Sequence, residues 1–310
     1  MLEWDDSTPA LVYSTRFDEG KAPAHLRLNI KFSRGLTMLK QTILALLIVS
    51  SFPFVGLATW SVVAVDQRTG EVVIASATCV AQSRFAAGFS AKGLMDIQAI
   101  VVPGKGVAAA QASVDRTRTN QELIHNQIEN GTDPTEIIRM LQKDPEIAHR
   151  QFGIVDLRGR HAGYTGAGNG AVALHATGQV TGEPIFYAIQ GNILAAEAVV
   201  DEAVFALQVA SGSLTDRVMA AMEAADTNGG DRRCDCNTEP WPEAPCDGKT
   251  AHVAYILQAH ADDTSGDSFN NGDYKMYLSA TDEDIRPSEN ANPVKTLRMR
   301  YDAWMSTHGR

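Results

Sequence analysis

The sequence predicts an α+β protein with a four-layer αββα sandwich, in which two mainly antiparallel sheets are covered by helices. Two observations lead to this fold class. The predicted elements run in the order strand pairs, two helices, strand pairs, two helices, strands and a closing helix. Short turns join the strands of each pair, whereas parallel strands need long crossovers, so antiparallel sheets are expected. Two such apolar sheets bury one face against each other and the other face under helices.

The first half of the predicted domain contains two strand pairs and two helices. Gly70 supplies the permissive backbone of the first hairpin turn. Asp133 is the expected N-cap of a helix, and Pro134 is the expected first residue of that helix. The expected strands are 60–66, 71–77, 96–102 and 106–113, and the expected helices are 119–130 and 134–142.

The second half repeats the order of strands and helices. Two segments have apolar residues at helical spacing, and a further helix closes the chain. Residues 166–181 are rich in glycine and are expected to form a loop. The expected strands are 151–157, 160–165, 185–190, 251–258 and 274–279, and the expected helices are 195–210, 214–225 and 294–306.

Two segments precede the domain. Residues 1–37 are polar, mixed in charge and without a period, and a second methionine follows them, so we interpret them as a gene-start artefact or a disordered extension. Residues 38–58 have the parts of a secretory signal peptide: Lys40, an apolar run and a small-x-small exit that ends at Ala58. The sequence therefore predicts a secreted or periplasmic protein that meets a membrane only through this leader. A retained anchor is the alternative.

Composition limits the partners of the remaining chain. Residues 59–310 are enough for one large core, which we interpret as a single domain. The full chain of 310 residues has a formal net charge of −10 and no cluster of lysine and arginine. Because nucleic-acid phosphates demand basic patches, a nucleic-acid partner is not expected.

Thr59 is the first candidate catalytic residue. Cleavage after Ala58 leaves Thr59 with a hydroxyl and a free α-amine on one residue. These are the groups of an N-terminal nucleophile, whose amine is the general base for its own hydroxyl. The cut is essential because a peptide nitrogen has a delocalised lone pair, whereas a free α-amine has a pKa of about 7.7–8.0. The alternative is an ordinary β-branched residue at the start of a strand.

Several short segments carry a family resemblance. They are Thr-Trp-Ser-Val-Val-Ala at 59–64, Ala-Gln-Ala at 110–112, Gly-Ile-Val-Asp at 153–156, Tyr-Thr-Gly at 164–166, Gln-Gly-Asn-Ile-Leu at 190–194 and Gly-Gly-Asp-Arg-Arg at 229–233. Together they resemble the bacterial and archaeal family called domain of unknown function 1028, which is placed in the Ntn-hydrolase-like (N-terminal nucleophile) superfamily. That superfamily implies the same αββα sandwich. Family members that look cytosolic begin Met-Thr-Phe-Ser, so the resemblance also implies an N-terminal threonine, but no substrate.

Two amide side chains are candidates for the same site. Asn192 follows a glycine at a strand end, where its amide is expected either to donate to an oxyanion or to cap the following helix. Gln111 is the polar residue of an alanine-rich strand. It either orients the amine of Thr59 and contacts substrate, or satisfies a buried backbone group.

Three charged residues follow a pair of glycines. Asp231 is a candidate partner for the ammonium group of Thr59, and Arg232 and Arg233 are candidates for binding an anionic group of the substrate. The alternative is an exposed salt bridge of little energetic value.

An insert at 234–247 departs from the family pattern and carries Cys234, Cys236 and Cys246. In an exported protein these favour a disulfide, most simply between Cys246 and one of the other two. A zinc site with His252 is the alternative. Cys79 is left as the fourth disulfide partner or as a buried thiol.

The sequence thus predicts an exported amidohydrolase that acts on a small-molecule or peptide amide without a cofactor or a metal ion. Thr59, Asn192 and Asp231 are the expected catalytic residues, and Gln111, Arg232 and Arg233 are expected to bind substrate. The rival hypothesis is a non-catalytic protein that binds a ligand or a cell-wall partner in the same cleft. The sequence leaves open whether the protein forms a homo-oligomer.

Overall fold

The computed structural model describes residues 59–85, 93–266 and 269–308, which belong to one compact unit. The predicted leader at 38–58 and the segment 1–37 lie outside the described residues. From Thr59 onward the described chain forms an α+β fold with two antiparallel sheets.

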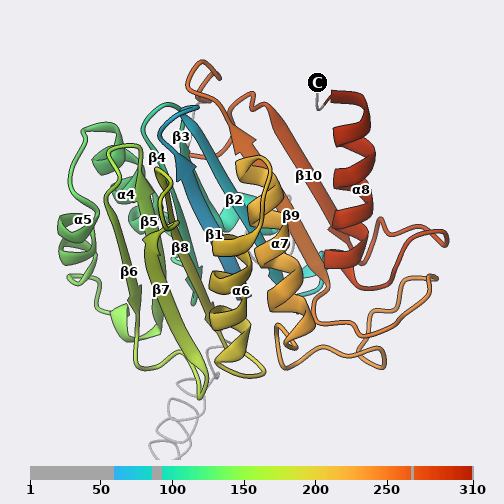
Figure 1. The fold of residues 1–310 in the computed structure, drawn as a ribbon. Coiled ribbons are helices and arrows are strands. Elements are labelled where there is room, and N and C mark those ends of the chain that lie inside the picture. The colour runs from blue at the N-terminus through green and yellow to red at the C-terminus, as the bar shows by residue number, and fades with distance from the viewer. Residues whose placement is uncertain (1–58, 86–92, 267–268, 309–310) are drawn as a thin grey trace, which may run out of the picture. The chain divides into compact units, whose positions relative to one another are not determined.

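The larger sheet has six strands in the order β10-β9-β2-β1-β8-β7 (Figure 1). Every neighbouring pair in it is antiparallel. Gly70, with φ of 72°, lies in the turn between β1 and β2, as predicted. The strands are β1 (Thr59–Asp66), β2 (Glu71–Thr78), β7 (Ala173–Gln179), β8 (Ile185–Asn192), β9 (Val253–Ala259) and β10 (Met276–Thr281).

The smaller sheet has four antiparallel strands in the order β3-β4-β5-β6. Strands β4 and β5 contact β1, and β5 also contacts β8, so the two sheets face each other. The strands are β3 (Ala99–Val102), β4 (Gly106–Ala112), β5 (Arg150–Asp156) and β6 (His161–Thr165).

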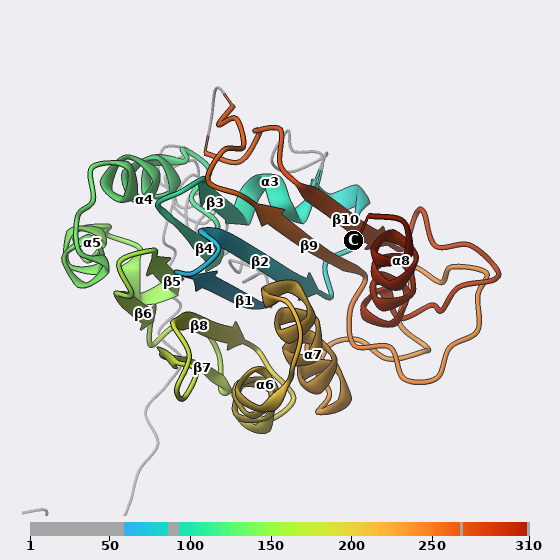
Figure 2. The same ribbon diagram turned by 45° about the horizontal axis from the view of Figure 1, so that its top comes forward.

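Helices cover the outer faces of the sheets. Helices α6 (Ala198–Val209), α7 (Leu214–Thr227) and α8 (Pro293–His308) pack on the six-stranded sheet, and α4 (Thr119–Glu129) and α5 (Pro134–Leu141) pack on the four-stranded sheet (Figures 1 and 2). None of the helices in the described part of the chain is both long and apolar enough to span a bilayer.

Strand β1 is buried on both faces, and its side chains divide between two cores. Trp60, Val62 and Ala64 join the core under α6, α7 and α8, whereas Val63 and Val65 join the core that contains residues of both sheets. A third core lies between the four-stranded sheet and helices α4 and α5. The continuous apolar run of β1 follows from this double burial.

Most predicted elements are present within a few residues, and Asp133 caps α5 by accepting from Thr135 N at 2.9 Å. Two predictions were wrong. The strand expected at 96–102 begins as a short helix, α3 (Leu94–Gln98), and the loop expected at 166–181 contains β7. Strand β7 lies at the edge of its sheet and is only partly buried, so its sequence lacks a clear apolar alternation.

Candidate functional site

Thr59 begins β1 and lies between two strand ends of the larger sheet. It is paired in register with Thr78 of β2 on one side and Asn192 of β8 on the other. Its backbone N donates to Asn192 Oδ1 at 3.2 Å, and its hydroxyl donates to Thr78 Oγ1 at 3.3 Å. With residue 58 still attached, Thr59 is 1% exposed. Both groups expected to act in catalysis therefore contact neutral polar side chains of the flanking strands.

Gln111 reaches Thr59 from the opposite sheet. Its Nε2 donates to the carbonyl oxygen of Thr59 at 3.0 Å and to Gln151 Oε1 at 2.8 Å. Its Oε1 accepts from Ser61 Oγ at 2.6 Å and from Gln98 Nε2 at 2.8 Å. The contact with Thr59 is the one expected of a residue that satisfies a buried backbone group.

We call Ser61, Gln98, Gln111, Gln151 and Gln190 the amide network. Gln190 Nε2 donates to Ser61 Oγ at 2.6 Å, and Gln151 Nε2 donates to the carbonyl of Gly191, beside Asn192, at 2.9 Å. All five side chains are buried and uncharged. Sequence reasoning assigned a role only to Gln111, although each of the other glutamines was a polar residue in an apolar segment.

Two non-glycine residues near Thr59 have left-handed backbone conformations. Ala112, which follows Gln111, has φ of 72°, and Ile193, which follows Asn192, has φ of 53°. Such conformations are costly for β-branched and other substituted residues and cluster at functional sites. The strain therefore lies directly after the two amides that hold Thr59.

Asn192 is the last residue of β8, and it does not cap the next helix. The N-cap position of α6 is held by Glu197, whose side chain makes no capping hydrogen bond. Of its two predicted roles, capping is thus excluded by position. Its Oδ1 instead accepts from the nitrogen of Thr59.

Asp231 is fully buried beside this strand end. Its carboxylate accepts from the backbone N of Cys79 at 2.9 Å and from Arg233 Nε and Nη2 at 3.0 and 2.7 Å. Arg233 was predicted to bind substrate, but it forms a salt bridge with Asp231. The Arg233 side chain is 29% exposed, and the Asp231 side chain is fully buried. Arg232 is exposed, and its backbone N donates to the carbonyl of Ile193 at 3.3 Å, which places it next to Asn192.

The four cysteines form two disulfides. Cys236 pairs with Cys246 and closes the insert, which is one of the two pairings expected. Cys79, directly after β2, pairs with Cys234 and ties this strand end to the loop that carries Asp231. The alternative, a zinc site made of the three insert cysteines and His252, is not present in this structure, because these cysteines belong to two separate disulfides.

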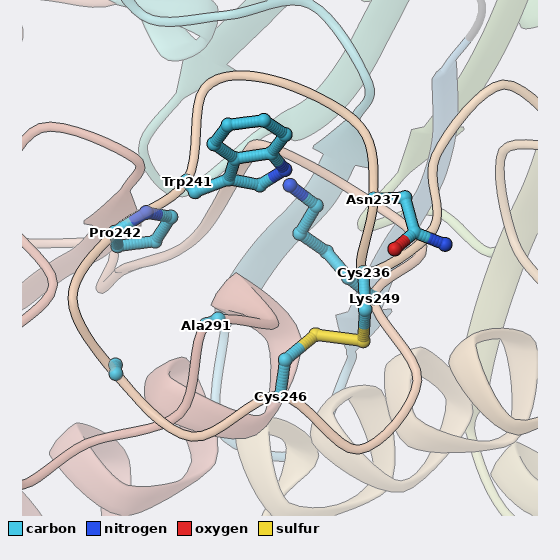
Figure 3. Close-up of a pocket in the computed structure, with 8 residues that line it drawn as sticks. Cys236, Asn237, Trp241, Pro242, Cys246, Lys249 and Ala291 are labelled. Atoms are coloured by element: carbon cyan, nitrogen blue, oxygen red, sulfur yellow. A yellow bond between two sulfur atoms is a disulfide. The ribbon is translucent and has the colours of Figure 1, made fainter.

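The insert borders a cavity of about 170 Å³ (Figure 3). Trp241, Lys249 and the Cys236–Cys246 disulfide line it, and Thr59 does not. Lys249 Nζ donates to the carbonyls of Thr238 and Pro240, and burial lowers its pKa. This cavity is therefore a feature of the insert and is separate from the strand end that holds Thr59.

A buried histidine and a buried carboxylate lie near the Cys79–Cys234 disulfide. His252 precedes β9, Asp282 follows β10, and both side chains are 2% exposed. His252 Nδ1 and Asp282 Oδ2 are 3.9 Å apart. Burial, with the nearby charges of Lys249 and Arg233, lowers the pKa of His252 to about 4, and burial raises the pKa of Asp282 to about 6. Sequence reasoning missed Asp282, which only the pairing of β9 with β10 brings to His252.

Comparison with known proteins identifies a family. The chain is similar to the crystal structure of protein SPO2555 from Silicibacter pomeroyi, assigned to the family DUF1028, with 20% sequence identity and a TM-score of 0.58. The match covers 81% of this chain and 91% of that chain, which shows a shared fold. No curated protein matches the chain. A family model described as a family of unknown function (DUF1028) matches residues 59–237, more than half of the sequence. The chain therefore belongs to the DUF1028 family.

Proposed function

We propose that this protein is an exported N-terminal-nucleophile hydrolase that cleaves an amide bond and that Thr59 is its nucleophile after cleavage behind Ala58. The observation that carries the proposal is the placement of Thr59, whose nitrogen and hydroxyl contact Asn192 and Thr78 at 3.2 and 3.3 Å. The family match supports it, because it begins at Thr59. Two facing antiparallel sheets with helices packed on them support a four-layer αββα sandwich of the Ntn-hydrolase type.

The proposed reaction uses both groups of Thr59. The freed α-amine takes the hydroxyl proton, Oγ1 attacks the substrate carbonyl, and the proton then passes to the leaving amine. A free α-amine has an ordinary pKa of about 7.7–8.0, so a fraction of it is neutral and can act as a base at neutral pH. Water then hydrolyses the acyl-enzyme ester.

Asn192 serves two purposes in this scheme. Its Oδ1 holds the nitrogen of Thr59, and its Nδ2 is the donor that we assign to the oxyanion of the tetrahedral intermediate. Gln111 fixes the carbonyl of Thr59 and thereby positions the nucleophile. Asp231 holds Arg233 rather than serving in proton transfer, and the exposed Arg232 is the residue that we assign to an anionic group of a small-molecule or peptide substrate.

Export is part of the proposal. Two disulfides are typical of proteins that fold in an oxidising compartment, which supports a secreted or periplasmic location. Export also supplies the cut on which the chemistry depends.

The second candidate function is a non-catalytic protein that binds a ligand. It is favoured by the 1% exposure of Thr59 and by the position of the cavity over the insert, away from Thr59. The two functions differ in whether Thr59 reacts.

The test combines processing with covalent labelling. The secreted protein is sequenced from its N-terminus and then treated with an electrophilic amide or lactone probe. We expect the mature chain to begin at Thr59 and to take up one probe at that residue. Thr59→Ser should keep the labelling and Thr59→Ala should abolish it, each with its processing checked by mass spectrometry.

Thr215→Ala is the matched control, because Thr215 is a similarly buried threonine of α7 whose hydroxyl contacts Tyr301 of α8. It should label like the wild type. Correctly processed protein that no probe labels would favour the ligand-binding function, and labelling that survives Thr59→Ala would refute the assigned nucleophile.

A further inference from the structure

A second group of chemically active side chains lies beside the Cys79–Cys234 disulfide. The sulfur atoms of Cys79 and Cys234 and a ring nitrogen of His252 all lie within 4.8 Å of one another. The backbone N of His252 donates to the carbonyl of Thr78 at 2.7 Å, which extends the pairing of β2 with β9 and fixes His252 next to Cys79. The sheet thus brings His252 next to Cys79, and the disulfide brings Cys234 to both of them.

Two atoms of this group have no hydrogen-bond partner among the described residues. They are His252 Nδ1 and Asp282 Oδ2, which are 3.9 Å apart on side chains that are only 2% exposed. The other carboxylate oxygen, Asp282 Oδ1, accepts from Gln82 N at 3.0 Å and so fixes the orientation of the group. Buried polar atoms are nearly always satisfied, so two adjacent unsatisfied atoms need an explanation, and a bound ion is one such explanation.

We propose that Cys79, Cys234 and His252 bind one zinc-like divalent metal ion when the Cys79–Cys234 disulfide is reduced. Two sulfur atoms and one imidazole nitrogen are three of the four donors of a tetrahedral Zn²⁺ site, and a water molecule takes the fourth position. Calcium and magnesium need oxygen donors, so this set selects against them. The site does not depend on the reactivity of Thr59.

Conversion of the Cys79–Cys234 disulfide to the metal-binding form needs a reductant, and a dithiol supplies the electrons. The dithiol gives two electrons and two protons to the disulfide, which yields two cysteine thiols and an oxidised, disulfide form of the reductant. The metal ion then displaces both thiol protons. With Zn–S bonds of about 2.3 Å, tetrahedral geometry puts the two sulfur atoms about 3.8 Å apart. The Cα atoms of Cys79 and Cys234 are 5.6 Å apart, so rotation of the side chains provides most of that separation.

Cys79 links the proposed site to the strand end that holds Thr59. The backbone N of Cys79 donates to Asp231, so the site adjoins the residues that border Thr59. Reduction of the disulfide and binding of the metal ion are therefore expected to change the positions of the residues around Thr59.

The test uses Co²⁺ as a spectroscopic probe for Zn²⁺ on the full chain, expressed with its leader so that any processing is kept. The variant Cys236→Ser/Cys246→Ser retains Cys79 and Cys234 alone, and Cys79→Ser/Cys234→Ser is its matched control. Each is reduced, freed of reductant without oxygen, and titrated with Co²⁺. We expect the first variant to bind one Co²⁺ with thiolate-to-cobalt charge-transfer absorption and tetrahedral d–d bands, and the second to show neither.

Two further variants test His252 and its neighbour Asp282 and keep both cysteines. His252→Gln should weaken Co²⁺ binding at least tenfold in the reduced Cys236→Ser/Cys246→Ser background, and Asp282→Asn should weaken it by a smaller factor. The oxidised protein should not bind Co²⁺, and it serves as the folded control if loss of the disulfide impairs folding.

The proposal is overturned if the reduced protein binds no Co²⁺. It is also overturned if His252→Gln leaves the affinity and the spectrum unchanged, or if Cys79→Ser/Cys234→Ser gives the same spectrum as its counterpart.

Discussion

The two buried polar regions near Thr59 differ in charge. In the amide network, Gln111 makes four hydrogen bonds to neutral partners and no member carries a charge, although Gln190 Oε1 has no partner among the described residues. The neighbouring charged cluster is made up of the titratable residues Asp231, Arg233, Lys249, His252 and Asp282, and in it His252 Nδ1 and Asp282 Oδ2 have no partner among the described residues.

This difference separates positioning from chemistry. A neutral network of hydrogen bonds rigidifies the residues that it joins, and it does so at little electrostatic cost. A cluster of buried charges is expensive unless its members are paired with each other or bound to a ligand. We therefore assign the amide network to holding Thr59 in place and the charged cluster to binding.

The largest expected effect tests the amide network. Gln111→Leu leaves the carbonyl of Thr59 and the groups on Ser61, Gln98 and Gln151 without their partner. At about 1 kcal/mol for each lost hydrogen bond, we expect unfolding free energy to fall by about 4 kcal/mol, measured by urea denaturation.

Gln121→Leu is the control for this variant. Gln121 is as buried as Gln111, but it makes one hydrogen bond, from Nε2 to the carbonyl of Ile97, and its Oε1 has no partner among the described residues. Its loss should cost about 1 kcal/mol or less. Equal costs for the two variants would contradict the idea that Gln111 is the centre of a network.

Gly153 tests how tightly the network is packed. A Cβ atom at this position of β5 would lie 2.0 Å from Gln190 Oε1 and 2.7 Å from its Cδ, so Gln190 must move away from Ser61. We expect Gly153→Ala to lower unfolding free energy by about 3 kcal/mol, the upper range for overpacking. Gly93→Ala is the control, because its Cβ would meet nothing closer than 3.5 Å. If the unfolding temperature falls by the same amount in both variants, Gln190 has room to shift.

The sequence was sufficient to predict much of the architecture and the location of the candidate residues. The hairpin at Gly70 and the cap at Asp133 are local signals, and both are present in the structure. Thr59 and Asn192 were singled out separately and are direct neighbours in the sheet. Local patterns and a family resemblance together indicate which residues matter before their contacts are known.

Contacts between distant segments could not be predicted in the same way. Cys79 and Cys234 are 155 residues apart, and no local pattern specifies their pairing. His252 and Asp282 meet because Val253 of β9 is opposite Thr281 of β10, and such a register depends on the folded sheet. The partners of Gln111 come from both sheets, so the alternation within one strand gives no sign of them.

Arg233 tests the charged cluster at its one complete ion pair. Arg233→Ala leaves the fully buried carboxylate of Asp231 with only backbone donors. Breaking a fully buried pair costs several kcal/mol, but the Arg233 side chain is 29% exposed, so we expect a loss of about 2 kcal/mol in urea denaturation. Arg139→Ala breaks a pair whose side chains are 63% and 39% exposed, so its loss should be much smaller. Similar losses would place the Asp231 pair among ordinary surface pairs.

The smallest expected effect concerns two carboxylates of α7 outside both regions, and it tests whether burial alone distinguishes a site. Burial raises the pKa of Asp226, although Asn292 and Thr250 donate to it, and Lys295 and Glu223 are the charges that act on it. Burial also acts on Asp216, but hydrogen bonds from Ser213 and Tyr301 leave its pKa lowered. The two groups therefore affect stability with opposite signs.

For Asp226, the raised pKa means that the folded state binds its proton more tightly than the unfolded state. Its contribution to stability is complete below the ordinary carboxyl pKa of about 4 and is lost as pH rises through the folded value. Asp226→Asn removes this loss and should make the protein more stable than wild type at neutral pH, with a gap that shrinks as pH falls. Asp216→Asn should destabilise the protein at neutral pH, with a gap that closes as pH falls through the lowered pKa. Thermal unfolding of both variants between pH 2 and 8 distinguishes these slopes, because the change for Asp216 lies below pH 4 and that for Asp226 lies above it. Slopes of the same sign would show that burial, rather than the hydrogen-bond partners, decides the state of these carboxylates.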